Sequence, residues 1–333
     1  MITKFQDEFF WMLKESKGYY PWVKDRPYEL RNFMDNYFGH CDCGFHRHDQ
    51  YRNVYGTIKL LLNEGFLVNE IIDLFFKSLI RAEIRFISRY VPQRSNEERL
   101  TGNLVSEIDN SIHLVKDECY KFSMNLYNEN KCIDFIYTDM SRGGKVEKET
   151  GADLGFILVL DLPDYPYTVK TLTLQAKNIR RSTQINRMQY ETMTRICKDH
   201  GSCAYLFYDT DLNVLTSPMV LRTDDHNFET KYNDCKERGN KSFSVNIDEV
   251  YRGQPLSLFI LSCLLYDTCG TTHSSFDSAM KYFTDAIFQS NKGEDYIFNG
   301  RVGVVSLGKK IQYLINETKN DVGGLDIFLP KDK

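Results

Sequence analysis

The stretch Gly151–Asn178, GADLGFILVLDLPDYPYTVKTLTLQAKN, holds two apolar runs separated by a turn, DLPDYPY, with two prolines and two aspartates. Such runs around a proline-containing turn predict two β-strands joined as a hairpin. Asp153 opens the first run, and Gln175 and Lys177 close the second. Because strand side chains alternate, Gln175 and Lys177 project from one face and Ala176 from the other. A carboxylate, an amide and an amine are therefore expected to converge.

This trio suits a divalent metal ion beside a phosphodiester. Mg²⁺ binds carboxylate, carbonyl and water oxygens, so Asp153, the amide oxygen of Gln175 and a backbone carbonyl are the predicted ligands, and Mn²⁺ accepts the same donors. Lys177 would face the phosphate, orient or help deprotonate the attacking water, and offset the charge that develops on phosphorus. The alternative is structural: Asp153 caps a turn, Gln175 is tolerated at a strand end, and Lys177 reaches solvent.

The order GAD, hairpin, QAK resembles the core of the PD-(D/E)XK nuclease superfamily, in the Q-x-K form shared with Mrr-type restriction enzymes. The resemblance covers roughly residues 95–210. It implies an α/β (α+β) fold with a restriction-endonuclease-like core, in which helices flank a central mixed β-sheet. It also implies that Asp153 is the motif aspartate, that Gln175 and Lys177 form the (D/E/Q)-x-K pair, and that a preceding helix supplies another acid. Ala152 stands where the motif has proline.

The segment Ser95–Lys116 is predicted to form that helix, with Glu97 and Glu98 in its first turn. At about 100° per residue, Glu97 projects about 20° from Leu104, whereas Glu98 projects about 120° from it. Glu97 therefore lies on the face expected to pack towards the sheet, although both glutamates also complement the helix dipole. The family carries an active-site Glu on its first core helix, so the resemblance favours Glu97, with Glu98 and Glu107 as alternatives.

Segments on both sides of the hairpin complete the element order of the family's core. Val68–Tyr90 has the spacing of an amphipathic helix, and Cys132–Thr138 is a predicted first strand. Ser182–His200 has the length and periodicity of a helix, and Cys203–Tyr208 is typical of a buried strand. With the hairpin, the predicted order from residue 95 to residue 210 is helix, strand, strand, strand, helix, strand.

Positive charge follows the hairpin at Arg180, Arg181 and Arg187. These side chains are the predicted phosphate contacts, which would supply affinity and position without reading base sequence. The alternative is that they line a solvated helix face. Gln189 and Tyr190 resemble the Gln and Tyr that some family members place beside the active site.

A separate cluster, GHCDCGFHRH, is rich in metal ligands. Its spacing is tighter than that of the usual zinc finger or ribbon, and no second pair of ligands follows. A structural Zn²⁺ is one interpretation, and a coincidence in an exposed loop is the other. The residues concerned are His40, Cys41, Cys43, His46 and His48.

Length and composition indicate a globular protein. The chain has 333 residues, 42% hydrophobic and 26% charged, which favours one large or two modest domains. The predicted division is a helical N-terminal region at 1–92, a nuclease-like core at 93–212 and a C-terminal α/β region at 213–333. The net charge of −4 argues against a basic protein that coats nucleic acid, so any such contact must be a local patch.

The sequence shows neither a signal peptide nor a membrane span. The N-terminus lacks a signal-peptide cleavage site, and the longest apolar stretch, Pro255–Tyr266, is short for a membrane span. Nine cysteines fit reduced thiols better than a disulfide framework. We expect a cytoplasmic protein without a membrane partner, and homo-oligomerisation remains open.

Together the residues and the resemblance predict a Mg²⁺-dependent endonuclease that hydrolyses phosphodiester bonds of nucleic acid, in DNA more than in RNA. Asp153 would bind the metal, Gln175 would ligate it or position the water, and Lys177 would assist attack. Glu97 would complete the acidic set. Restriction or antiviral defence follows from the Mrr-like resemblance alone.

Two other interpretations come from different functional classes. One is a degenerate nuclease fold that binds nucleic acid or a partner protein without cleavage, because Gln175 removes a charge from the metal site. The other is a zinc-stabilised interaction module centred on residues 40–48.

Overall fold

The computed structural model describes most of the chain after residue 68. The described residues are 69–93, 95–122, 132–139, 153–163, 165–200, 203–210, 217–265, 269–289 and 301–318. The predicted zinc cluster at residues 40–48 lies outside them, as does most of the predicted N-terminal region.

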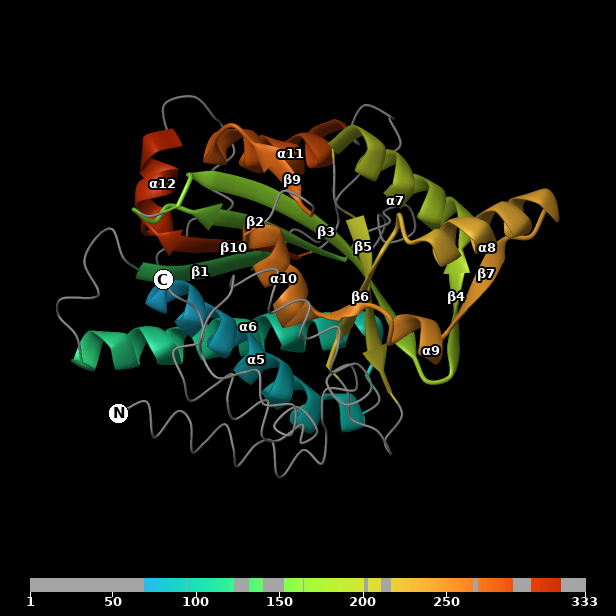
Figure 1. The fold of residues 1–333 in the computed structure, drawn as a ribbon, viewed down its shortest axis with the longest axis horizontal. Coiled ribbons are helices and arrows are strands. Elements are labelled where there is room, and N and C mark those ends of the chain that lie inside the picture. Colours follow the sequence, from blue (N-terminus) through green and yellow to red (C-terminus); the bar gives the residue numbers. More distant parts are fainter. Residues whose placement is uncertain are drawn as a thin grey trace, which may run out of the picture.

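Among these residues, eight strands form one mixed sheet (Figure 1). Seven are neighbours in the order β1 (Cys132–Asp139), β10 (Arg301–Gly308), β2 (Leu154–Leu160), β3 (Thr168–Ile179), β5 (Cys203–Asp209), β6 (Met219–Arg222) and β8 (Gln254–Pro255). The eighth, β9 (Thr271–His273), pairs with the beginning of β3. The pairs β10–β2 and β3–β5 are parallel, and the others are antiparallel.

Helices cover both faces of the sheet (Figure 1). One face packs against α5 (Glu70–Arg89), α6 (Glu97–Phe122) and α10 (Leu256–Leu265). The other face packs against α11 (Phe276–Gln289), α12 (Ile311–Thr318) and part of α7 (Arg187–His200). A short 3₁₀ helix, Val91–Gln93, follows α5. The predicted α/β class with a mixed central sheet between helices is therefore confirmed.

The two apolar runs form strands that are buried on both sides. In β2, Phe156 and Leu158 face the α5–α6 layer, whereas Ile157 and Val159 face α11 and α12. A strand covered on both faces needs a continuous apolar run, which is the pattern of β2.

The predicted hairpin is confirmed. β2 and β3 are antiparallel with Leu154 opposite Leu174, and the backbone N–H of Asp153 donates to the carbonyl of Leu174 at 2.9 Å. Asp153 therefore lies beside the carboxyl-terminal part of β3. This register positions the candidate site.

A second sheet pairs β4 (Ser182–Asn186) with β7 (Ser242–Asn246), and α8 (His226–Glu237) and α9 (Ile247–Val250) lie nearby (Figure 1). The prediction that one helix covers Ser182–His200 is wrong in its first part, because α7 begins at Arg187. Ile185 is buried and packs with Val245 of β7, a partner remote in sequence. The side chain of Asn186 then accepts from the N–H groups of Met188 and Gln189 and starts the helix.

The central sheet crosses the predicted boundary at residue 212. Strands β6, β8, β9 and β10 all come from beyond it, and β10 lies between β1 and β2. At the end of β10, Gly308 has φ +112°, and a Cβ there would lie 1.8 Å from the carbonyl oxygen of Asp161. Next to Gly308, the N–H of Asp161 donates a 2.8 Å hydrogen bond to the carbonyl of Leu307 and so ties the end of β2 to β10. Glycine is required there by both conformation and space.

We expect Gly308→Ala to lower the free energy of unfolding by about 2–4 kcal/mol, because it adds a backbone clash to an unfavourable φ. Gly239→Ala is the matched control: Gly239 has φ +69° and no atom within 4 Å of the added Cβ. The control should lose only about 1 kcal/mol from the positive φ. Urea denaturation measures both, and equal losses would contradict this account of the β10 insertion.

Candidate active site

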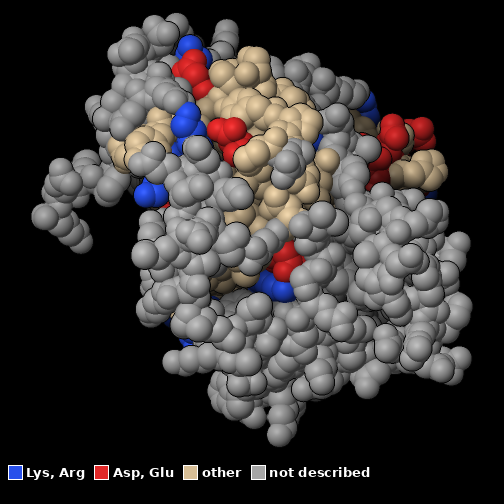
Figure 2. Space-filling view, turned by 60° about the vertical axis from the view of Figure 1, so that its left-hand side comes forward, with Lys and Arg blue, Asp and Glu red and all other residues tan. Residues whose placement is uncertain are grey.

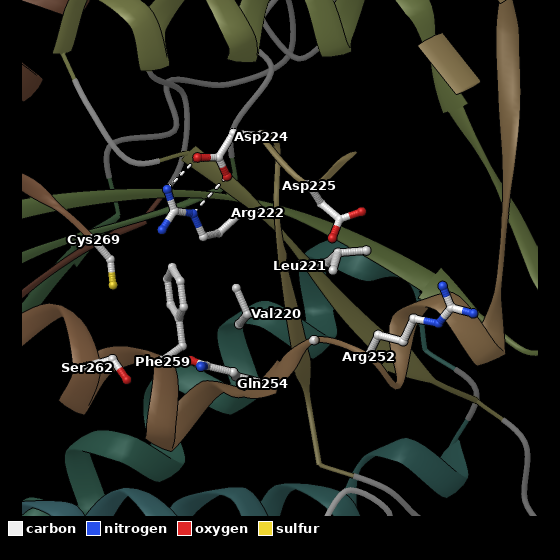
Figure 3. Close-up of a pocket in the computed structure, with 11 residues that line it drawn as sticks. Val220, Leu221, Arg222, Asp224, Asp225, Arg252, Gln254, Phe259, Ser262 and Cys269 are labelled. Atoms are coloured by element: carbon white, nitrogen blue, oxygen red, sulfur yellow. Dashed lines mark hydrogen bonds and ion pairs between the residues drawn. The ribbon is translucent and has the colours of Figure 1, made fainter. Parts of the chain in front are cut away.

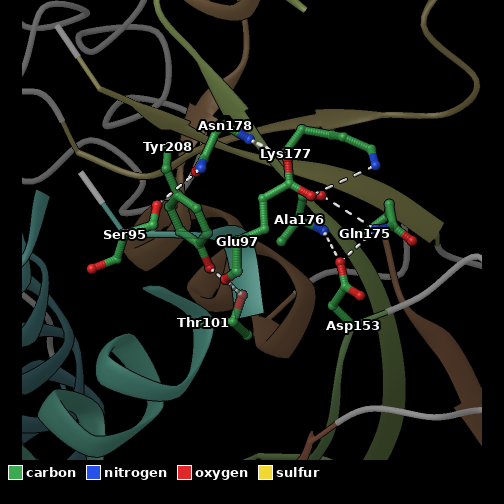
Figure 4. Close-up of polar contacts among 9 residues, drawn as sticks. All are labelled: Ser95, Glu97, Thr101, Asp153, Gln175, Ala176, Lys177, Asn178 and Tyr208. Atoms are coloured by element: carbon green, nitrogen blue, oxygen red, sulfur yellow. Dashed lines mark hydrogen bonds and ion pairs between the residues drawn. The ribbon is translucent and has the colours of Figure 1, made fainter. Parts of the chain in front are cut away.

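Asp153 and Gln175 meet at the end of the hairpin (Figure 4). Oδ2 of Asp153 accepts a hydrogen bond from the backbone N–H of Ala176 at 2.9 Å and another from Nε2 of Gln175. Gln175 is only 3% exposed, whereas Ala176 packs into the opposite core. The expected convergence of carboxylate and amide is present, and strand alternation produces it.

The amide of Gln175 is only half satisfied. Its Nε2 also donates to the carbonyl of Ala176 at 3.2 Å, but its Oε1 is buried and has no hydrogen-bond partner within the described part of the chain. A buried acceptor without a partner loses about 1–3 kcal/mol of solvation. Such an oxygen marks a position where a ligand would be stabilising.

Lys177 and Glu97 lie beside this pair (Figure 4). Nζ of Lys177 is 3.8 Å from Oε2 of Glu97, and their side chains are 15% and 35% exposed. The other carboxylate oxygen of Glu97 accepts from the backbone N–H of Asn178 at 2.8 Å. The backbone of β3 therefore holds one oxygen of Glu97, and the other oxygen, Oε2, faces Lys177.

Further contacts fasten the start of α6 to the sheet. Nδ2 of Asn178 donates to the carbonyl of Ser95 at 3.2 Å, and the hydroxyls of Thr101 and Tyr208 are 3.0 Å apart. Asn178, Thr101 and Tyr208 were not among the residues expected at the site. Asn178 leaves a signal, since it is a polar residue that follows Leu172, Leu174 and Ala176 on one face of β3. The buried hydroxyl pair leaves none, because its members are far apart in sequence.

Of the three candidate helix acids, Glu97 is the one beside the hairpin. Glu98 is exposed to solvent. Glu107 is buried between α5 and α6, where it accepts from Nε of Arg85 at 2.7 Å and from the hydroxyl of Tyr90 at 3.2 Å. Glu107 thus joins two helices.

Burial raises the pKa of Asp153 from 3.8 to about 6. The hydrogen bond from Ala176 and the charge of Lys177 lower this pKa, whereas the charges of Glu97 and Glu98 raise it. Desolvation is the largest effect, so the ionised carboxylate is unfavourable in its surroundings. A cation bound at Asp153 would relieve this penalty.

The three arginines do not form one cluster. Arg180 is exposed and lines a pocket of ≈ 180 Å³ with Ser95 and Asn178, next to the candidate site. Arg181 is exposed in the turn between β3 and β4, and the five-residue strand β4 separates it from Arg187, roughly 15 Å of extended chain. Nε of Arg187 is 3.6 Å from the carboxylate of Glu191.

The suggestion that Gln189 and Tyr190 lie at the active site fails for Tyr190. Tyr190 is 2% exposed, and its hydroxyl donates to the carbonyl of Thr223 at 2.8 Å. Its ring stacks on Phe228 and meets Phe243 edge to face. Tyr190 belongs to a core cluster that includes Tyr205 of β5 and Phe243 of β7.

Within the described residues, no group of three or more His, Cys, Asp or Glu side chains is arranged to hold a metal ion. Figure 2 shows separate basic and acidic positions on the described part of one face, without a continuous basic field there. Among the described helices, none combines the length and apolar character that crossing a bilayer requires.

No protein-family model, curated protein or solved structure matches this chain. Function is therefore inferred from the residues of the site themselves.

Without metal, we expect Asp153→Asn to stabilise the protein. The folded-state pKa of Asp153 is raised, so the stability associated with the protonated form is present below about pH 4 and is lost as the pH rises through 6. The asparagine oxygen can accept the same two hydrogen bonds without charge, and the gain near pH 7.5 should be about 2–3 kcal/mol.

Urea denaturation in EDTA, near pH 7.5 and again near pH 4, measures the effect, which should vanish at the lower pH. Asp248→Asn, at an exposed position in α9, is the control and should change stability little. A destabilised Asp153→Asn protein at the higher pH would refute the account.

Proposed function

We propose that this chain is a metal-dependent nuclease of the PD-(D/E)XK type that hydrolyses phosphodiester bonds, in DNA more than in RNA. The observation that carries the proposal is the amide of Gln175, whose NH₂ group donates to the carboxylate of Asp153 while its Oε1 is buried and unpartnered. Lys177 projects from the same strand face at the same end of the hairpin. With the two ends of the amide exchanged, a divalent cation would satisfy both the Gln175 oxygen and the carboxylate of Asp153.

The order of elements supports the proposal. The core elements α6, β1, β2, β3, α7 and β5 follow one another as the nuclease core requires. β2 and β3 are antiparallel, and β3 and β5 are parallel with α7 between them in sequence. Two additions modify that core: β10 lies between β1 and β2, and β4 precedes α7.

The donor set fits Mg²⁺ or Mn²⁺. Asp153 offers a carboxylate, Gln175 an amide oxygen and Ala176 a carbonyl, all of them hard oxygen ligands. In the structure, the NH₂ group of Gln175 donates to the carboxylate of Asp153 and to the carbonyl of Ala176. If the amide exchanged its two ends, three oxygens would face one another, which is stable only with a cation among them. When bound, the metal would lower the pKa of a water molecule and offset phosphoryl charge.

Lys177 and Glu97 would prepare the site for attack on phosphorus. The ammonium of Lys177 would hold the attacking water and place positive charge near the developing oxyanion. Glu97 receives the backbone N–H of Asn178 and approaches Lys177 with its other oxygen, so it limits where the ammonium lies. Asp153 would supply the negative charge that retains the cation.

The proposed partner is nucleic acid, and Arg180 is the arginine best placed to meet its backbone. Arg180 lines the pocket that also includes Ser95 and Asn178, and Asn178 donates hydrogen bonds to both Ser95 and Glu97. A cationic side chain at this position would bind a phosphate next to the scissile one. Restriction or antiviral defence is the biological role that we propose from the Mrr-like motif.

Cleavage of supercoiled plasmid, linear DNA and RNA tests the activity, with Mg²⁺, Mn²⁺ or EDTA. The wild type should cut only with metal, and Lys177→Ala and Asp153→Ala should reduce the rate by about a thousandfold or more, as loss of a transition-state contact does. Lys241→Ala, an exposed lysine, is the control and should cut normally. Cleavage that survives Lys177→Ala would exclude this site.

A second candidate function is a nuclease fold that binds nucleic acid without cleavage. It is favoured by the hydrogen bond from Gln175 to Asp153, because the amide already partners the carboxylate in the absence of a metal. The two functions differ in metal affinity.

Titration with Mg²⁺ and Mn²⁺ separates them. For the nuclease, wild-type protein should bind metal, Gln175→Ala should bind more weakly, and Gln175→Glu should bind about tenfold more tightly, because it adds a charged ligand. If Gln175→Glu binds the metal and the wild-type protein does not, the non-cleaving function is established instead.

A further inference from the structure

A second pocket, of ≈ 280 Å³, lies between the end of β6 and α10 (Figure 3). It is lined by Arg222 of β6, by Phe259 and Ser262 of α10, and by Cys269 just before β9. The close-up shows the Sγ atom of Cys269 near Phe259 and Arg222. None of these residues belongs to the candidate active site.

Cys269 is one member of a thiol pair. Sγ of Cys263 donates a hydrogen bond to Sγ of Cys269, and the two sulfur atoms are 2.7 Å apart. Cys263 is fully buried on α10, whereas Cys269 is 6% exposed and lines the pocket. A reagent in the pocket therefore meets Cys269 first, and the second sulfur lies directly behind it.

Cys263 lies within a helix, and Cys269 lies two residues before a strand. Cys263 lies in α10, whose apolar side chains pack into the main core. Cys269 precedes Gly270, which has φ +82° and lies against the side chain of Lys170, where an added Cβ would be only 3.1 Å from Lys170 Cδ. Lys170 in turn pairs with Thr272 of β9. The contact between the sulfur atoms therefore joins α10 to the segment that leads into β9.

We propose that Cys263 and Cys269 form a peroxide-reactive dithiol, in which Cys269 is oxidised through the pocket and Cys263 resolves it into an intramolecular disulfide.

The chemistry needs only the two thiols and a peroxide. The thiolate of Cys269 attacks one peroxide oxygen, the O–O bond breaks, and the other oxygen leaves as water after taking a proton, so that Cys269 becomes a sulfenic acid. Cys263 then loses its proton and attacks Sγ of Cys269, and the hydroxyl leaves as a second water. Two thiols are oxidised by two electrons, and one peroxide is reduced to two waters.

The surroundings assign the two roles. The hydrogen bond from Cys263 is the largest influence on the pKa of Cys269 and lowers it. Burial raises this pKa, and the charges of Arg222 and Lys170 lower it, so that the net direction is downward. Burial raises the pKa of Cys263. The thiolate is the reactive form, so the cysteine that faces the pocket is also the one more readily ionised.

Peroxide treatment of the purified full-length chain, followed by peptide mass mapping, tests the proposal. We expect a disulfide between Cys263 and Cys269 that dithiothreitol reverses, formed at least about tenfold faster than oxidation of Cys203 or Cys235. Cys263→Ser should stop at a sulfenic acid on Cys269, trapped by dimedone. Cys269→Ser should leave Cys263 unreacted, and Cys235→Ser is the control and should form the disulfide normally.

The wild-type experiment is decisive even if a variant fails to fold. Absence of the Cys263–Cys269 disulfide under peroxide, or oxidation of Cys203 and Cys235 at the same rate, overturns the proposal. Dimedone labelling of Cys263 in Cys269→Ser also overturns it, because it means that Cys263 does not need Cys269 for access. The experiment measures thiol oxidation and not cleavage, so its result does not depend on the proposed nuclease activity.

Discussion

The hydrogen bond from the backbone N–H of Ala176 to the carboxylate of Asp153 fixes the candidate site. It follows from the antiparallel register that sets Leu154 opposite Leu174. A shift of one residue would turn Gln175 and Lys177 to the opposite face and bring Ala176 out of the core. The apolar residues that bury both faces of β2 and β3 therefore also determine which polar groups meet at the end of the hairpin.

Glu97 links the helical layer to this hairpin, and its two oxygens contribute differently. The ion pair with Lys177 is 3.8 Å long and partly exposed, so it contributes only about 0–1 kcal/mol to stability. The 2.8 Å hydrogen bond from the N–H of Asn178 is shorter and sets the position of the carboxylate. Glu97 is thus better explained as a positioning group for Lys177 than as a source of stability.

The sequence predicted the hairpin and its polar ends because the signals are local. Asp153, Gln175 and Lys177 stand at the ends of apolar runs, and the two-residue period of a strand determines their faces. Glu97 was also correctly placed near the sheet, because helical periodicity relates it to Leu104.

The remaining elements could not be predicted from the sequence, because they depend on pairing between strands that are far apart along the chain. Ser182–Asn186 becomes a strand because β7, some sixty residues later, offers it a partner, and no local pattern reveals that partner. The same applies to β10, which enters the sheet from the C-terminal region and separates β1 from β2.

The choice of glutamine at position 175 has a physical consequence for the whole site. A glutamate there would place a second buried carboxylate beside Asp153, whose pKa burial already raises to about 6, and the two charges would repel without a metal. The glutamine amide removes that repulsion by donating to Asp153. Glutamine also lacks the negative charge that would attract a cation, so in the proposed nuclease metal binding would draw more on Asp153 and on the substrate phosphate. The proposed nuclease would therefore bind its metal most tightly with nucleic acid in place.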